Sequence, residues 1–193
     1  MKIKIAVVGC GRIAAKHFES IQKYGDDLDL VAICDTNQDV LDKYTFEFGV
    51  EGYTSMLDML KSVDIDIVTI CTPSGLHSDQ TVLAAEHNVN VMTEKPMATR
   101  WSDGIRMVKA CDDAGVRLFV VKQNRKNSTL QLLKRAITGK RFGKINMVHI
   151  NVFWTRPQEY YDQAEWRGTW EFDGGAFMNQ ASRSEERRVG KEC

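Results

Sequence analysis

The stretch Ile3-Lys4-Ile5-Ala6-Val7-Val8-Gly9-Cys10-Gly11-Arg12-Ile13-Ala14, at the start of the 193-residue chain, decides the fold. Its first six residues form a mostly apolar run, typical of a buried parallel strand, and a GxGxxA motif follows directly. The first glycine permits a tight turn, the second lets the backbone approach a pyrophosphate, and Ala14 allows close helix–strand packing. The N-terminus of the following helix would offer its N–H groups to the phosphates.

The strand–helix unit repeats over the first two-thirds of the chain. Further short runs rich in Val and Ile predict strands at 28–34, 65–71, 89–93 and 118–121. Between them, apolar stripes predict helices on Ala14, Phe18, Ile21 and Tyr24; on Leu57, Leu60 and Val63; and on Ile105, Val108 and Cys111. The last helix has Thr99 or Ser102 as its expected N-cap and Gly115 just past its end. This alternation predicts an α/β fold, a Rossmann doubly wound parallel sheet.

The pattern changes after residue 123. A helix is expected over 128–138 with Leu130, Leu133 and Ile137 facing inward, followed by a long strand over 144–154. An aromatic and polar loop then leads to Asp173-Gly174-Gly175 and another apolar segment. We expect a Rossmann domain over 1–123 and the truncated start of an α+β substrate domain over 124–182. The strand over 144–154 would present open edges, which predicts poor solubility.

The last eleven residues, 183–193, depart from this pattern because most of them are charged. A solvated C-terminal tail is one interpretation. The preferred one is that Arg-Ser-Glu-Glu-Arg-Arg-Val-Gly-Lys-Glu-Cys resembles a translated DNA-sequencing adapter, which would make the tail non-native and the chain a fragment.

Composition restricts the class of protein. The formal net charge is zero, with 26 basic and 26 acidic residues, which argues against a nucleic-acid partner. No apolar run is long enough for a membrane span, and the start is too short for a signal peptide. Cys10, Cys34 and Cys71 fall in or beside apolar runs without CxxC spacing, so buried thiols and a cytoplasmic location are expected. The four histidines have no metal-ligand spacing, and no metal is predicted.

Asp35 gives the motif its context. It stands at the end of the second predicted strand, 24 residues beyond Gly11. Its carboxylate suits a ribose diol and would repel a 2′-phosphate, and neighbouring Thr36 supplies no positive charge, so NAD is favoured over NADP. The alternative is a glycine turn in a Rossmann-like domain that binds no dinucleotide.

Lys95 lies in Thr93-Glu94-Lys95-Pro96, directly after the predicted strand at 89–93. Ligands of doubly wound sheets bind at the carboxyl ends of the strands, so Lys95 would project into the cofactor crevice and exchange a proton with a substrate hydroxyl. Pro96 would hold the turn, with a cis bond as one option. The alternative is a surface lysine. His77, in the turn after the strand at 65–71, is by itself more often a packing histidine than a catalyst.

In this order, GxGxxA, Asp35, the 72–77 turn and Glu94-Lys95-Pro96 resemble the Gfo/Idh/MocA family of NAD(P)-dependent sugar oxidoreductases, over residues 1–182. Segments 121–125, 153–161, 166–170 and 173–182 are similar to its nucleotide-sugar branch, the UDP-N-acetylglucosaminuronate 3-dehydrogenases of lipopolysaccharide biosynthesis. The resemblance implies oxidation of the sugar 3-hydroxyl to a ketone by tightly held NAD, before a transamination, in a homo-oligomer. Alternatives are an inositol- or glucose-type dehydrogenase of the family, or a non-catalytic NAD-binding interaction protein.

The resemblance also implies roles for individual residues. Lys95 would be catalytic, with Asn179 at the polar position of the family's second motif. That motif needs a histidine four residues later, where Arg183 stands, so the fragment is expected to be inactive. Nucleotide-sugar contacts are expected from Gln123, Asn124, Arg156 and Tyr160. Together with the loop residues, the expected cofactor contacts are Gly9, Gly11, Arg12, Ile13, Ala14, Asp35, Thr72, Pro73, Ser74, His77, Glu94, Lys95, Trp166 and Arg167.

Overall fold

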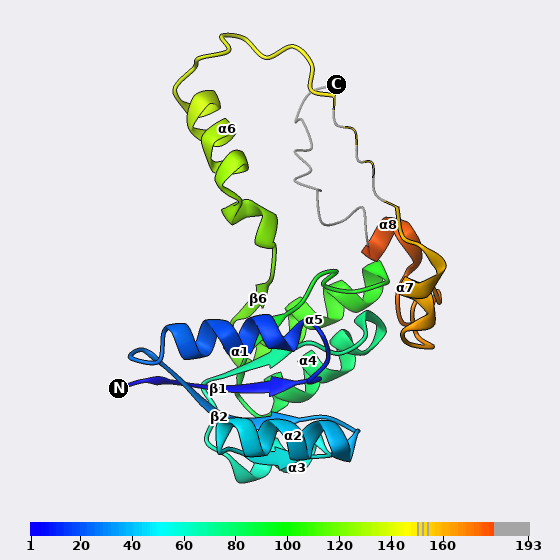
Figure 1. Ribbon diagram of the computed structural model, residues 1–193. Helices are drawn as coiled ribbons and strands as arrows, with labels where there is room; N and C mark the ends of the chain where they lie inside the picture. Colours follow the sequence, from blue (N-terminus) through cyan, green and yellow to red (C-terminus); the bar gives the residue numbers. More distant parts are fainter. Residues whose placement is uncertain (150, 152, 154, 180–193) are drawn as a thin grey trace.

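A six-stranded parallel sheet forms the centre of the protein (Figure 1). The computed structural model describes residues 1–149, 151, 153 and 155–179. The strand order is β3-β2-β1-β4-β5-β6. The strands are β1 (Ile3–Val8), β2 (Leu28–Cys34), β3 (Glu51–Tyr53), β4 (Ile67–Ile70), β5 (Asn90–Thr93) and β6 (Leu118–Val120). This order confirms the predicted doubly wound sheet.

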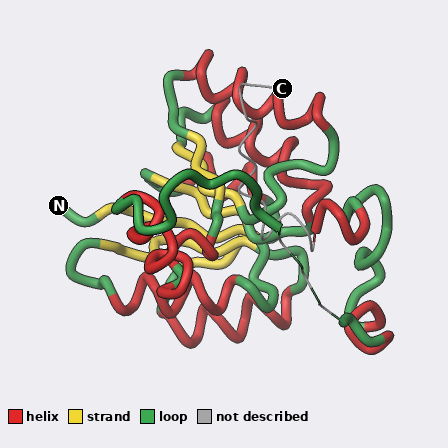
Figure 2. Tube along the Cα trace, turned by 90° about the horizontal axis from the view of Figure 1, so that it is seen from above, coloured by secondary structure: helices red, strands yellow, loops and turns green. Residues whose placement is uncertain are grey.

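Helices cover both faces of the sheet (Figure 2). One apolar cluster joins the sheet to α1 (Ala14–Lys23) and α2 (Gln38–Phe48). The other joins it to α3 (Met56–Ser62), α4 (His77–Glu86) and α5 (Trp101–Ala114). The remaining helices are η1 (Ser74–Leu76), η2 (Gln123–Lys126), α6 (Ser128–Thr138), α7 (Gln158–Asp162) and α8 (Gly175–Asn179).

The register of the sheet positions the site. Val8 pairs with Cys34 on one side and with Ile70 on the other, and Ile70 pairs with Thr93. The carboxyl ends of β1, β2, β4 and β5 therefore meet at one edge. The segments that follow these four strands, which contain the predicted site residues of the first domain, are brought together there.

Some predicted helix faces are wrong in detail. On α5, Ile105 and Val108 are 50% and 44% exposed, whereas Met107 and Cys111 are buried. Its N-cap is Arg100, not Thr99 or Ser102, while its C-cap is Gly115, with φ +69°, as predicted. The inward stripe is rotated because Met107 and Cys111, one turn apart, face the core. Tyr24 and Leu57 are likewise exposed.

The segment after β6 differs most from the prediction. Helix α6 forms over the predicted range, but Leu130, Leu133 and Ile137 are each 44–45% exposed, so the inward orientation is wrong. Figure 1 shows α6 standing away from the sheet. The described positions of the predicted strand over 144–154 are not in a strand, because every described strand belongs to the Rossmann sheet and none lies beside this segment. Positions 150, 152 and 154 lie outside the described residues, as does the predicted tail over 183–193.

The structure confirms the buried thiols. Cys10, Cys34, Cys71 and Cys111 are buried and unbridged, and Cys193 lies outside the described residues. In the part of the chain that the structure describes, no helix is long and apolar enough to cross a membrane.

Candidate active site

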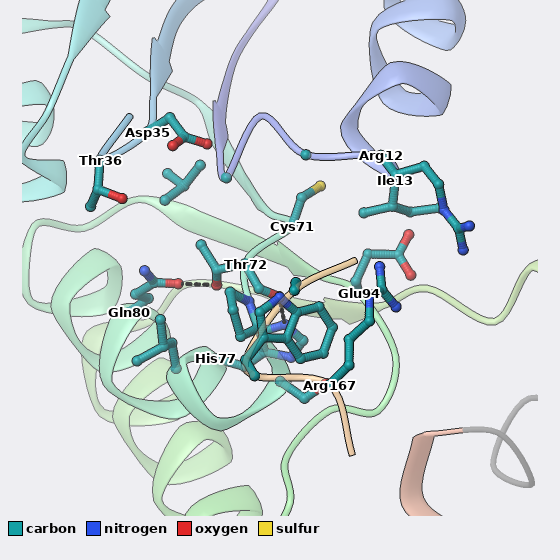
Figure 3. Close-up of a pocket in the computed structure, with 18 of the residues that line it drawn as sticks. Arg12, Ile13, Asp35, Thr36, Cys71, Thr72, His77, Gln80, Glu94 and Arg167 are labelled. Carbon is teal, nitrogen blue, oxygen red and sulfur yellow. Dashed lines mark hydrogen bonds between the residues drawn. The ribbon is translucent and has the colours of Figure 1, made fainter. Parts of the chain in front are cut away.

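A cavity of about 640 Å³ opens at the carboxyl edge of the sheet (Figure 3). The turns after β1, β2, β4 and β5 line one side, and the segment from α7 to α8 lines the other. Figure 3 places Asp35 and Thr36 at one end and Arg12, Glu94 and Arg167 at the other. The predicted site residues on its wall are Gly9, Gly11, Arg12, Ile13, Asp35, Thr72, Pro73, Ser74, His77, Glu94, Lys95, Tyr160, Trp166, Arg167 and Asn179.

The two loop glycines meet different constraints. Gly9 has φ +84°, and a Cβ there would lie 2.8 Å from the Thr72 backbone nitrogen and 2.9 Å from the Cys71 carbonyl carbon. At Gly11 a Cβ would meet nothing within 4 Å, so the space above the loop is open. Helix α1 begins at Ala14, which is fully buried against the sheet. The loop thus leaves room for a phosphate group beside the N-terminus of α1.

Asp35 is fixed by the loop that it faces. Its Oδ2 accepts a hydrogen bond from the Cys10 backbone nitrogen at 2.7 Å, and its Oδ1 accepts one from the Asn37 nitrogen at 2.9 Å. A carboxylate has about four lone-pair sites, so it can accept further bonds from two ribose hydroxyls. The neighbouring wall residues Thr36, Thr54 and Met56 carry no positive charge. This end of the cavity therefore fits a ribose diol and not a 2′-phosphate.

Lys95 stands at the other end of the cavity, with its side chain held by Asn179. It is buried, and its Nζ donates to the Asn179 backbone oxygen at 2.7 Å and to Asn179 Oδ1 at 2.8 Å. The preceding Glu94 is also buried. Its Oε1 lies 3.0 Å from His17 Nε2, and its Oε2 accepts from the Lys95 backbone nitrogen at 3.2 Å. The Lys95–Pro96 peptide bond is cis.

His77 connects two loops of the site. Its Nδ1 lies 2.9 Å from the Pro96 carbonyl oxygen and its Nε2 lies 3.0 Å from the Thr72 carbonyl oxygen. Burial lowers the pKa of His77, which is only 1% exposed. The neutral ring has one N–H, so it donates to one of the two carbonyls at a time. These contacts favour the packing role, because His77 ties the turn after β4 to the lysine loop.

The thiols beside the cavity are not nucleophiles. Burial raises the pKa of Cys10 to about 12 and that of Cys34 to about 11, and it raises the pKa of Cys71 as well. These groups therefore stay protonated at neutral pH, and the thiolate is the reactive form.

The segment after α7 brings cations and aromatic rings to the cavity. The Arg167 guanidinium lies 4.4 Å from the centroid of the Tyr160 ring and 4.8 Å from that of Trp166. The guanidinium groups of Arg12 and Arg156 lie 5.8 Å and 5.1 Å from the same Tyr160 centroid. Arg12 belongs to the phosphate loop, so Tyr160 joins the first domain to the later segment through cation–π contacts.

Not every predicted residue reaches the cavity wall. Ala14 packs beneath the loop, Arg156 contacts Tyr160 from outside the wall, and Gln123 and Asn124 lie in η2 after β6. Sequence reasoning missed the wall residues Thr54, Met56, Leu76, Gln80, Gln163 and Ala164. Gln80 could have been found, because it follows His77 by three residues and so shares its helix face. Its Oε1 accepts from Thr72 Oγ1 at 2.6 Å.

The fold and the site together define a dinucleotide-binding protein of the Rossmann type. Residues 3–122 match the Gfo/Idh/MocA model, described as an oxidoreductase family with an NAD-binding Rossmann fold, and residues 130–182 match the model of that family's C-terminal domain. The chain belongs to the Gfo/Idh/MocA oxidoreductase family, as the motifs had indicated.

Two solved structures are similar to almost the whole chain. The WlbA dehydrogenase from Chromobacterium violaceum, solved with NADH and UDP-GlcNAcA, is 60% identical, with a TM-score of 0.91. The match covers 95% of this chain and 53% of that one. The WlbA dehydrogenase from Bordetella pertussis, solved with the same two ligands, is 58% identical, with a TM-score of 0.92, over 95% and 56% of the two chains.

A curated relative is more distant. The myo-inositol 2-dehydrogenase of Thermotoga maritima is 30% identical over 149 residues, which are 77% of this chain and 44% of that protein. The chain therefore spans about half the length of the proteins that it matches.

Proposed function

We propose that this chain supplies the NAD site and the catalytic lysine of a dehydrogenase that oxidises the 3-hydroxyl of UDP-N-acetylglucosaminuronate for lipopolysaccharide biosynthesis. The observation that carries the proposal is that one cavity joins Asp35 and the glycine loop to the Lys95 amine. A dinucleotide bound with its adenosine ribose on Asp35 would extend toward that amine. The similarity to dehydrogenases solved with NADH and UDP-GlcNAcA supports the substrate.

The cofactor assignment rests on residues of this chain. Gly9 shapes the turn, Gly11 leaves open space for the pyrophosphate, and Asp35 accepts the ribose hydroxyls. Bound NAD would accept the hydride that leaves the substrate carbon. From the second side, Trp166 and Arg167 would cover the bound dinucleotide, since both line the cavity.

In the proposed reaction Lys95 handles the proton. As the hydride leaves the carbon, the hydroxyl oxygen releases its proton, and an amine within hydrogen-bond distance takes it. Among the described residues on the cavity wall, Lys95 is the one lysine, and Asn179 holds its Nζ. The partner histidine expected after Ser182 lies outside the described residues. The full reaction is therefore assigned to a protein in which the C-terminal domain is complete.

The nucleotide-sugar is the preferred substrate for a specific reason. The 60% identity extends over 95% of the chain and so includes much of the segment from α6 to α8, whereas the inositol dehydrogenase is half as similar over a shorter stretch. Arg156 and Tyr160 would contact the diphosphate and a ring of the substrate, and Gln123 and Asn124 are further candidates. We also propose a cytoplasmic homo-oligomer, in keeping with the buried thiols and with the family resemblance.

The test uses Lys95→Ala in the enzyme with a complete C-terminal domain. Turnover of UDP-N-acetylglucosaminuronate should fall by about 100-fold or more, since general acid–base catalysis contributes 10²–10⁴-fold. The Kd for NAD, measured by calorimetry, should change by less than about threefold, because the phosphate loop and Asp35 are intact. Lys61→Ala, on the exposed side of α3, is the matched control and should leave both values unchanged.

Three results would contradict this proposal in different ways. Absence of NAD binding by the unaltered protein would remove the cofactor assignment. Unchanged turnover in Lys95→Ala would give the lysine a structural role only, as in a non-catalytic NAD-binding protein. Turnover of free myo-inositol, with none of the UDP-sugar, would favour the inositol-type alternative.

A further inference from the structure

A buried carboxylate is linked to Lys95 through one side-chain amide. Asp173, 3% exposed, lies just before α8. Its Oδ2 accepts a hydrogen bond from the Gly168 backbone nitrogen at 2.8 Å, and its Oδ1 accepts one from Asn179 Nδ2. The same Asn179 presents its Oδ1 to Lys95 Nζ. The order is therefore carboxylate, amide, ammonium, with all three side chains buried.

This order allows only one orientation of the amide. An ionised carboxylate only accepts hydrogen bonds, and a lysine ammonium group only donates them. The NH₂ group of Asn179 must therefore face Asp173, and its oxygen must face Lys95. With the amide turned by 180°, two donors would meet at Lys95 and two acceptors at Asp173, which is costly for buried groups.

Asp173 is itself rigidly placed. Its backbone nitrogen and that of Gly174 both donate to the Thr169 carbonyl oxygen at 3.1 Å. Together with the bond from Gly168, these contacts close a tight turn around the carboxylate. The amide orientation is thus set by the turn at 168–174 rather than by Lys95, whose side chain arrives from the other domain.

The neighbouring carboxylate, Glu94, is engaged elsewhere. It directs Oε1 to His17 on α1 and uses Oε2 for the Lys95 backbone nitrogen. Lys95 Nζ donates to Asn179 twice, to the backbone oxygen and to Oδ1, so the position of Asn179 directs the amine. The side-chain half of this contact depends on Asp173, because that carboxylate orients the amide.

We propose that Asp173 is a positioning residue for the catalytic lysine: it fixes the Asn179 amide so that Oδ1 holds Lys95 Nζ at the cavity wall. This inference rests on the proposed function. In Asp173→Asn the new side chain offers one acceptor to two donors, so the Asn179 amide loses its fixed orientation. The consequence is a less precisely placed amine, with the dinucleotide site untouched.

The first test is a double-mutant cycle in the enzyme with a complete C-terminal domain. Asp173→Asn should lower kcat about tenfold and leave the Kd for NAD within about twofold. In an Asn179→Ala background the same change should alter kcat by less than about twofold, because the amide through which it acts is gone. Asp162→Asn, an exposed carboxylate on α7, is the control and should leave kcat unchanged. An equal loss in both backgrounds would overturn the proposal, since a structural role would be additive.

The second test needs no turnover and uses the 193-residue chain. With ¹⁵N-labelled asparagine, the Asn179 side-chain NH₂ should give a separate, slowly exchanging pair of signals, assigned by their loss in Asn179→Asp. This pair should collapse toward the position of solvated amides in Asp173→Asn and persist in Asp162→Asn. An unchanged pair in Asp173→Asn would overturn the proposal. Failure of the proposed function would appear separately, as absent NAD binding or turnover in the unaltered enzyme.

Discussion

Gly9 and Gly11 belong to the same motif, but the structure predicts different results when each becomes alanine. Gly9→Ala places a Cβ at φ +84° against the Thr72 and Cys71 backbone, so the free energy of unfolding should fall by roughly 2–4 kcal/mol. Gly11→Ala enters open space, so stability should change by less than about 1 kcal/mol. The new methyl group occupies the space left for the phosphate, and NAD should bind at least about tenfold more weakly.

Urea denaturation and calorimetry on both variants measure these two effects separately. Gly11→Ala that binds NAD as well as the unaltered chain would show that the diphosphate does not rest on this loop. The prediction for Gly9 would be contradicted by a variant with unchanged stability.

At the same scale, sequence reasoning found residues whose neighbours along the chain disclose them. Asp35 and Lys95 each follow an apolar run, and the carboxyl end of a parallel strand is where ligand-binding side chains gather. His17, which contacts Glu94, was not found as a site residue, because 77 positions separate the pair and nothing local links them. Asp173 was quoted only as part of a turn, since its contact with Asn179 requires the folded segment.

At the scale of elements, helix α6 supplies a prediction about solubility. Leu130, Leu133 and Ile137 form an apolar face that the described residues leave exposed. Replacing all three by Gln should lower aggregation of the 193-residue chain in light scattering, and the melting temperature of the Rossmann domain should stay within about 2 °C because α6 stands apart from the sheet. Phe46→Gln, a single exposed side chain on α2, is the control and should change scattering little.

Undiminished scattering in the triple variant would mean that another surface, such as the segment at 144–149, drives aggregation. The family model of the C-terminal domain begins its match at residue 130, on this helix. In a protein with that domain complete, the same substitutions should instead destabilise the enzyme, since the face would be buried.

Elements were predictable where a residue pattern and a nearby partner agree. The five apolar runs became strands because each lies beside another strand of the same sheet. Strand β3 was missed, since Glu51-Gly52-Tyr53 has three residues and no apolar pattern, and it forms by pairing with the end of β2. The stripe on α5 was misplaced because a helix with apolar residues on several sides gives no single face from sequence alone.

At the scale of the whole molecule, two parts of the chain nearly 100 residues apart enclose the cavity. The Gly75 backbone nitrogen donates to the Phe172 carbonyl oxygen at 3.0 Å. Only a glycine fits there, because a Cβ at Gly75 would overlap the Glu171 carbonyl oxygen and lie 2.9 Å from Phe172 Cα. The sequence could not predict this closure, since Gly75 reads as an ordinary turn residue and its partner belongs to another domain.

Gly75→Ala should therefore separate the segment at 163–175 from the Rossmann domain. Tryptic cleavage after Arg167 should become several-fold faster, because the loop that carries it loses its anchor. The Kd for NAD should rise several-fold as Trp166 and Arg167 withdraw from the cavity, while the sheet and its melting temperature stay the same. Gly104→Ala is the matched control: its Cβ would meet Met97 Cε at 3.9 Å and Ala98 Cβ at 4.0 Å, and alanine should stabilise α5 by up to about 1 kcal/mol. Cleavage at the same rate in both variants would show that Gly75 does not hold the segment, and the second wall of the cavity would then need another anchor.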